Sequence, residues 1–187
     1  MHDTRWLIAV LLTVTSFISH ASEFNFDLSS DTVDLSFTPP VSENGLQMDF
    51  GLLHNQDEGS VAAAGLHVVD DATADGRGFI VGLGGKLFVI DSDRANDTGG
   101  AIGVGAHFRY VFPSYNRISV GGEAYYAPDI LAFADTQEFL RFAVRGEYAV
   151  LRQARVFLGY RKVASNFKGT RSFDLDNGLH VGLNIEF

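Results

Sequence analysis

The last ten residues of the chain, GLHVGLNIEF (residues 178–187), decide the fold. Apolar side chains alternate with polar or small ones throughout, and the stretch ends with an aromatic residue that carries the terminal carboxylate. A period of two residues places alternate side chains on opposite faces of a β-strand. The stretch therefore predicts a strand with one apolar and one polar face, whose apolar positions are Leu179, Val181, Leu183, Ile185 and Phe187.

The same alternation recurs through the chain, and turn-rich segments such as residues 55–59 and 113–116 separate the alternating stretches. No stretch has the 3.6-residue period of an amphipathic helix, although residues 130–134 could make one turn within a loop. The fold class is therefore all-β. Besides 176–187, the predicted strands lie at about residues 44–54, 60–70, 78–90, 102–112, 118–126, 140–148 and 154–164.

The N-terminal stretch EFNFDLSSDTVDLSFTPP (residues 23–40) sets the number of strands. Its apolar residues occupy even positions up to Leu28 and odd positions from Val33. Because one strand cannot change phase in this way, the stretch predicts a tight hairpin of two short strands. Ten strands are therefore favoured, with eight as the alternative. Either number leaves both termini on the same side, which we expect to be the periplasm.

An alternating strand fits either a soluble sandwich, with its apolar face inside, or a membrane barrel, with its apolar face outside. The opposite faces here carry glycine, alanine and charged residues, which suits a narrow barrel interior. Short connections alternate with longer ones, as in outer-membrane barrels. Aromatic residues near strand ends predict an interfacial girdle, namely Tyr110, Phe112, Tyr126, Tyr148 and Tyr160. We therefore predict a small closed antiparallel transmembrane β-barrel.

The first 21 residues have the three-part pattern of a secretory signal peptide. A short polar start precedes an apolar run of 13 residues (6–18), and small residues at Ser19 and Ala21 fit a cleavage site. We expect cleavage after Ala21, a barrel over residues 22–187 and export to the bacterial outer membrane. The absence of cysteine agrees with a bacterial envelope protein, and a net charge of −9 argues against a nucleic-acid partner.

The closing strand also predicts a partner. A terminal strand that ends in phenylalanine is typical of the strand that the barrel-assembly machinery reads by adding it to an exposed sheet edge. The alternative is an ordinary edge strand that happens to end on Phe187. Outer-membrane lipids and lipopolysaccharide are the other expected partners, and we expect the protein to be a monomer.

Three stretches carry a resemblance to a known family: GGEAYYAPDILAF (121–133), RFAVRGEYAVLRQARVFLGYRKV (141–163) and the terminal HVGLNIEF. They resemble the YfaZ family of bacterial outer-membrane proteins, and residues 122–129 are the most specific part. The resemblance implies an integral outer-membrane β-barrel. It implies no reaction, since it brings no catalytic motif.

Inward-facing charged residues are the candidate functional site. They can pack the lumen as a hydrogen-bonded network, line a narrow pore that selects anions, or catalyse a reaction on lipids or peptides. No histidine lies in a recognisable hydrolase motif, and no cofactor or metal pattern occurs. The predicted lumen network consists of Lys86, His107, Arg109, Glu123, Arg141, Arg145, Glu147 and Arg161. We expect His107 to lie opposite Glu123, with Arg145 at a similar height one strand further on.

Overall fold

The structure is a computed structural model that describes residues 22–73, 78–93, 97–167 and 173–187. The predicted signal peptide lies outside the described residues. Among the described residues, no helix is long and apolar enough to cross a membrane.

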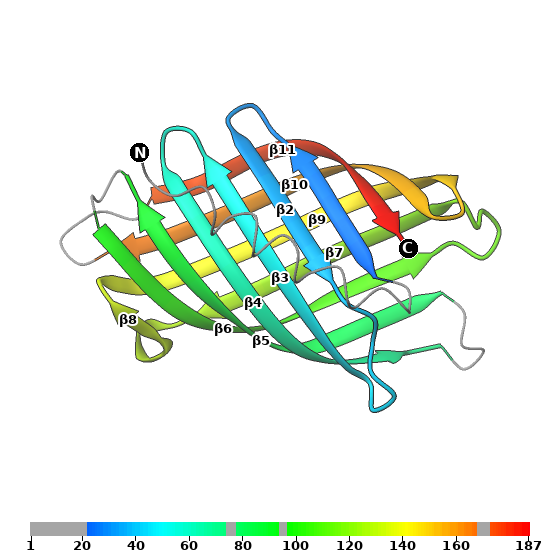
Figure 1. Cartoon of the computed structure of the whole chain (residues 1–187), viewed down its shortest axis with the longest axis horizontal. Helices are drawn as coiled ribbons and strands as arrows, with labels where there is room; N and C mark the ends of the chain where they lie inside the picture. The colour runs from blue at the N-terminus through cyan, green and yellow to red at the C-terminus, as the bar shows by residue number, and fades with distance from the viewer. Residues whose placement is uncertain (1–21, 74–77, 94–96, 168–172) are drawn as a thin grey trace, which may run out of the picture.

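Ten antiparallel strands close into a barrel (Figure 1). Each strand pairs with the next along the chain, and the last pairs with the first, so that Phe24 lies opposite Ile185. This pairing closes the sheet over residues 181–186 of the last strand, and hydrocarbon requires such closure of a spanning barrel. The strands are β1 (Glu23–Leu28), β2 (Thr32–Thr38), β3 (Leu46–Asn55), β4 (Gly59–Asp71), β5 (Phe79–Ser92), β6 (Asp97–Val111), β7 (Ile118–Ala127), β9 (Thr136–Leu151), β10 (Ala154–Phe167) and β11 (Phe173–Glu186).

The prediction of ten strands is confirmed, and the alternative of eight is wrong. The phase change in the N-terminal stretch is a two-stranded hairpin, β1–β2, whose turn is closed by a hydrogen bond from the backbone N–H of Ser29 to the carbonyl of Thr32 (2.9 Å). This hairpin supplies the strand that β11 needs for closure.

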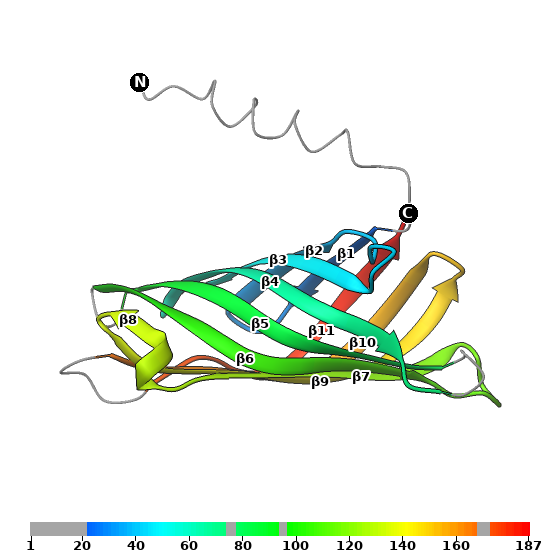
Figure 2. The ribbon, with the colours of Figure 1, turned by 90° about the horizontal axis from the view of Figure 1, so that it is seen from below.

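Ser22 and Phe187, the first and last described residues, lie at the same end of the barrel, which we call the terminal end. The backbones of Ser22 and Phe187 exchange hydrogen bonds of 2.8 and 3.0 Å. At the opposite end, the loop end, the β7–β9 connection forms a short 3₁₀ turn, η2 (Asp129–Leu131), and a short strand, β8 (Ala132–Ala134), which pairs with β6 (Figure 2). The side of the membrane on which the termini lie stays a prediction.

The strands at the loop end are longer than predicted. Residues 91–99 and 165–175 lie between the predicted strands and were expected to form long connections, the first because it contains turn-forming residues. Instead Asp91 pairs with Thr98, whose hydroxyl donates a hydrogen bond of 3.0 Å to the Asp91 carboxylate. Similarly, Ser165 pairs with Phe173. Cross-strand pairing overrides the local turn preference here, because each added residue pair satisfies backbone groups.

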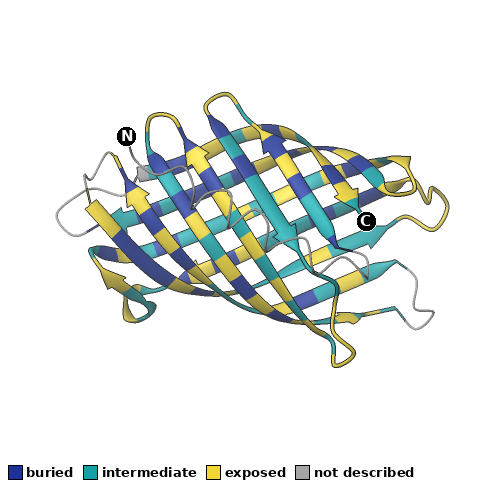
Figure 3. Cartoon of the chain, viewed as in Figure 1, coloured by how far each residue is buried: buried dark blue, intermediate teal, exposed yellow. Residues whose placement is uncertain are grey.

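The continuous apolar face of each strand points outward, and the face with the polar residues points into the lumen. Along the strands, buried and exposed residues alternate (Figure 3). Leu179 on the outer face is 69% exposed, whereas the inward Asn184 is completely buried. The barrel is therefore built with its polar face enclosed, as predicted for a membrane barrel.

Candidate functional site in the lumen

All eight predicted lumen residues point inward, and long side chains from facing walls meet across the barrel. The structure places Lys86 on β5, His107 and Arg109 on β6, Glu123 on β7, Arg141, Arg145 and Glu147 on β9, and Arg161 on β10. Seven of them, all except His107, form salt bridges with acidic or basic partners inside the barrel. These seven residues, together with further partners, form what we call the ionic layer. The further partners are Arg155, Glu23, Asp27, Asp34, Asp49, Asp176 and Glu186.

Arg161 is the centre of the ionic layer. Its guanidinium donates to Asp27 (2.7 Å), Asp34 (2.8 Å) and Asp176 (2.5 Å), which come from β1, β2 and β11. The side chain is only 1% exposed. A planar guanidinium with five donors can hold several carboxylates at once, which an ammonium group cannot do in the same geometry. Arg161 therefore ties β10 to the strands on both sides of the closing β1–β11 seam.

Glu123 is the second junction of the ionic layer. It accepts hydrogen bonds from Lys86 (3.0 Å) and from Nε of Arg141 (2.6 Å). Lys86 also forms a salt bridge with Asp49 (3.1 Å), and Arg141 donates to Asp34 (2.7 Å). Because Asp34 also binds Arg161, the two junctions form one continuous network.

A third junction lies nearer the terminal end. The carboxylate of Glu147 accepts from Nε of Arg109 (3.0 Å), Nε of Arg145 (2.7 Å) and the hydroxyl of Ser119 (2.9 Å). Nε of Arg155 lies 3.5 Å from the same carboxylate, and its Nη1 donates to Glu186 (2.5 Å). Glu23 lies 3.6 Å from Nη2 of Arg155, so three arginines share three carboxylates at this level, whereas a single arginine holds three at the Arg161 junction.

One expectation about this network is confirmed and another is wrong. His107 does pair with Glu123 across β6 and β7. On β9, however, Ala143 lies opposite Glu123, and Arg145 lies one inward position nearer the terminal end, where it binds Glu147. Arg141 binds Glu123 instead. Which residues meet in a barrel depends on the stagger between strands as well as on their distance in sequence from a turn.

Two histidines and a tyrosine form a buried cluster that sequence reasoning missed. The Tyr125 hydroxyl lies 2.8 Å from Nε2 of His67, and Nδ1 of His67 lies 3.1 Å from Asp49. The His107 ring lies 5.0 Å from the His67 ring, centroid to centroid. Two glycines give the rings their space, because a Cβ at Gly82 would lie 2.2 Å from the His107 ring and one at Gly84 would lie 2.8 Å from His67.

The aspartates of the ionic layer were also missed, for a reason that lies in the sequence. The aspartates of β1, β2 and β11 occur among other aspartates and serines, and that composition is typical of turns. Asp176 begins the predicted strand 176–187, and in the structure it points into the lumen beside Thr32 (3.0 Å). The alternation within β1 and β2 does place Asp27 and Asp34 on the inner face, so that signal was present.

A layer of apolar side chains crosses the lumen toward the loop end. Phe88 on β5 and Phe139 on β9 pack against each other with ring centroids 4.3 Å apart and a 38° tilt, and both are at most 1% exposed. Eight of the ten barrel strands, all but β1 and β2, contribute to this apolar layer, which consists of Leu53, Val61, Phe88, Ile90, Ala101, Ala127, Phe139, Val163, Phe167 and Leu175. We expected a lumen that is polar throughout, and the apolar layer shows that it is not. The continuous apolar run at residues 87–90 is the sequence signal for it, since both faces of the strand are apolar there.

The five predicted girdle residues all point outward. Tyr110, Phe112 and Tyr148 lie near the terminal end, where the Tyr110 and Phe112 rings are 5.1 Å apart. Tyr126 ends the apolar face of β7 and donates a hydrogen bond to Glu138 (3.0 Å). Tyr160 lies in the middle of β10, yet the outer face becomes polar directly beyond it, at Lys162. On β6, β7, β9 and β10, an outward aromatic residue therefore lies at a border of the apolar band.

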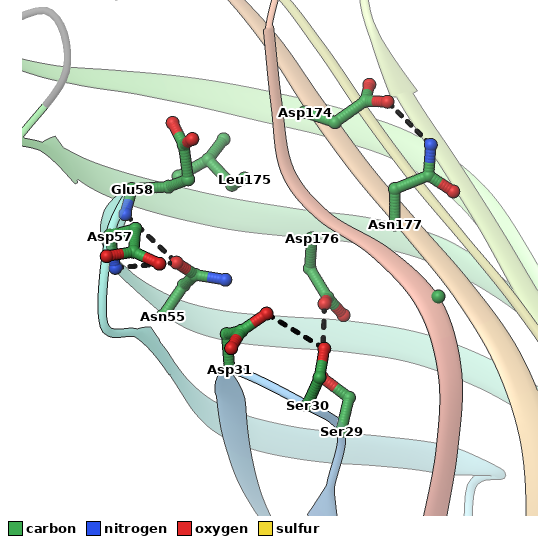
Figure 4. A pocket seen from close by; sticks show the side chains of 11 residues that line it. Ser29, Ser30, Asp31, Asn55, Asp57, Glu58, Asp174, Leu175, Asp176 and Asn177 are labelled. Carbon is green, nitrogen blue, oxygen red and sulfur yellow. Dashed lines mark hydrogen bonds between the residues drawn. The ribbon is translucent and has the colours of Figure 1, made fainter.

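Two rim pockets lie at the loop end, and one of them borders the apolar layer at Leu175. One, of about 230 Å³, lies between the β1–β2 turn, the β3–β4 turn and the start of β11 (Figure 4). The other is lined by residues of the β5–β6 hairpin, including Asp91, Asp93 and Asp97. No group of acidic or histidine side chains in the described part of the chain is arranged to hold a metal ion.

Comparison with known proteins identifies the family. The sequence profile described as "YfaZ precursor" matches residues 1–187. The chain belongs to the YfaZ family. It is similar to the outer membrane protein YfaZ of Escherichia coli (strain K12), with 28% identity over 149 residues, which cover 76% of each chain. This YfaZ-family chain is thus a protein of the bacterial outer membrane, made as a precursor.

Three solved structures of outer-membrane proteins match most of this chain at low sequence identity. The KdgM porin covers 89% of this YfaZ-family chain and 99% of its own, with a TM-score of 0.46 and 12% identity. The NanC porin covers 90% and 98%, with a TM-score of 0.46 and 10% identity. The outer membrane channel DcaP of Acinetobacter baumannii covers 87% and 54%, with a TM-score of 0.46 and 9% identity.

Proposed function

We propose that this barrel is a structural or binding protein of the outer membrane whose lumen is closed by its own side chains. The observation that carries the proposal is the apolar layer. Its ten members are at most 1% exposed, so water does not reach them from either end. An ion entering the lumen would lose its hydration there without gaining a polar partner, which is unfavourable by several kcal/mol or more.

The ionic layer supports the same proposal. A conducting lumen needs polar side chains that face water, whereas Arg161 and Glu147 are buried among their partners. Charged groups satisfied in this way pack the interior and join distant strands. Removal of any one of them leaves its partners buried without a counter-charge, which is unfavourable. The network therefore also favours one register of the strands.

Planar-bilayer recording of the refolded mature protein tests the proposal. We expect no discrete conductance steps for the wild-type barrel, with a known porin refolded in the same way as the positive control. The variant Phe88→Ala/Phe139→Ala removes both rings of this packed pair and should give steps. Steps from the wild-type barrel would contradict the proposal and favour the very narrow pore with a charged lumen.

The outer surface supports further proposals about partners. The apolar band with aromatic borders fits lipid acyl chains and lipopolysaccharide, and we infer a monomer with its termini in the periplasm. We also infer that the assembly machinery reads β11 together with Phe187, which follows it; Leu183 of β11 and Phe187 are both exposed. Lower yield of inserted barrel for Phe187→Ala, but not for Val150→Ala, which removes an exposed apolar side chain near the same end of β9, would support this role in cells.

An enzymatic role finds no support in the geometry. Asp49, His67 and Tyr125 lie in series and have the residue types of a proton relay. However, the side chains of His67 and Tyr125 are each 1% exposed. A substrate has no access to them, so their role is to pack the lumen.

A further inference from the structure

The barrel wall is lower on one side than on the other at the loop end. β1 and β2 have 6 and 7 residues, whereas β10 and β11 have 14 each. β1 pairs with β11 only from Glu186 to Val181. In the described part of the chain, residues 173–180 of β11 therefore pair with β10 on one side and with no strand on the other. Backbone groups along such an edge are free to pair with another strand.

The rim pocket of about 230 Å³ lies at this edge. Figure 4 shows Asp31 from the β1–β2 turn, Asp57 from the β3–β4 turn, and Asp174 and Asp176 from β11 around it. Glu58 also lines the pocket, and its lining contains no lysine or arginine.

The carboxylates of the pocket differ in how far they are neutralised. Asp176 is bound to Arg161, and Asp174 to Lys162 (3.3 Å). Asp31 accepts a hydrogen bond from the Ser30 hydroxyl (2.8 Å), and within the described residues neither Asp31 nor Asp57 forms a salt bridge. Since these acidic groups are spread along the rim and are not arranged to hold a metal ion, they suit several separate cationic side chains.

The rim pocket and the free edge of β11 (residues 173–180) together form a notch in the barrel wall. We propose that this notch binds an extended peptide segment rich in lysine or arginine, which adds to the free edge as an extra strand. Main-chain hydrogen bonds to residues 173–180 would supply affinity without regard to sequence. Side chains on one face of an extended strand recur at about 6.6 Å intervals, so basic residues at alternate positions can reach the carboxylates of both turns. The proposal does not depend on whether the lumen conducts.

Binding of a synthetic peptide to the refolded mature protein in a non-ionic detergent tests this proposal. The probe is a fluorescein-labelled peptide of about eight residues with alternating lysine and threonine, the latter for its strand propensity. We expect saturable binding by fluorescence anisotropy that weakens with added salt. The same peptide with alternate backbone nitrogens methylated cannot pair with the edge and should bind at least about tenfold more weakly.

Two matched variants separate the notch from general surface charge. Asp31→Asn/Asp57→Asn removes two negative charges from the notch and should weaken binding about tenfold. Asp93→Asn/Asp97→Asn removes two from the other rim pocket and should leave binding unchanged. Circular dichroism confirms that each variant is folded.

Three results would overturn the proposal: no binding by the wild-type barrel, equal binding of the methylated peptide, or equal weakening by both double variants. The methylated peptide tests strand addition on the wild-type protein, so that arm does not depend on the folding of any variant.

Discussion

The lumen is filled in two different ways along its length. Toward the loop end, an apolar layer built around Phe88 and Phe139 closes it by close packing. Further along, the ionic layer fills it with arginines and carboxylates, with Arg161 at the centre. Apolar packing fails gradually as atoms are removed, whereas a buried charge that loses its partner is strongly unfavourable. The two layers should therefore respond differently to truncation.

Arg161→Ala should have the largest effect. It leaves the carboxylates of Asp27, Asp34 and Asp176 close together without their shared cation. We expect the free energy of unfolding to fall by about 3–5 kcal/mol. Urea unfolding of the refolded barrel in lipid vesicles measures the change. A loss below about 1 kcal/mol would mean that the three aspartates are not ionised together, and the ionic layer would need another explanation.

Phe88→Ala should come next, with a loss of about 3 kcal/mol from the cavity it leaves in the apolar layer. Val89→Ala is the matched control because Val89 is the next residue on β5 and points outward. The same urea titration compares the two. If Phe88→Ala costs no more than Val89→Ala, the apolar layer is loosely packed and does not seal the lumen.

Glu123→Ala should have an intermediate effect, about 2 kcal/mol, because its partners keep other carboxylates. Lys86 retains Asp49 and Arg141 retains Asp34. The thermal midpoint of the folded barrel should fall, and Glu123→Gln should recover part of the loss by keeping hydrogen-bond acceptors. An unchanged midpoint in Glu123→Ala would count against a packed ionic network at this junction.

Lys162→Ala should have the smallest effect. Lys162 follows Arg161 in the chain but points outward, where its salt bridge with Asp174 is about one-third exposed on both sides. Exposed pairs of this kind contribute at most about 1 kcal/mol. The contrast with Arg161→Ala therefore compares two neighbouring cations on opposite faces of one strand. Similar losses for both variants would argue against enclosure as the source of the difference.

Much of the fold could be predicted from the sequence because the period of two is a local property. The ten strands, the β1–β2 hairpin and the inward direction of all eight charged residues follow from alternation and its phase. The partner of Arg145 could not be predicted, because it depends on the stagger of β9 against β7. The apolar layer was missed since Phe88 and Ile90 lie in a run that is apolar on both faces.

The sequence alone determined which face of each strand is apolar, and therefore which side chains meet lipid and which are enclosed. A strand's geometry assigns alternate residues to opposite faces whatever lies beside it. Only the tertiary structure decided which enclosed residues meet. Arg161 and Asp27 are 134 residues apart in the chain and are joined because the barrel closes between β11 and β1. Strand tilt and stagger bring such residues to one height, and these are properties of the closed barrel as a whole.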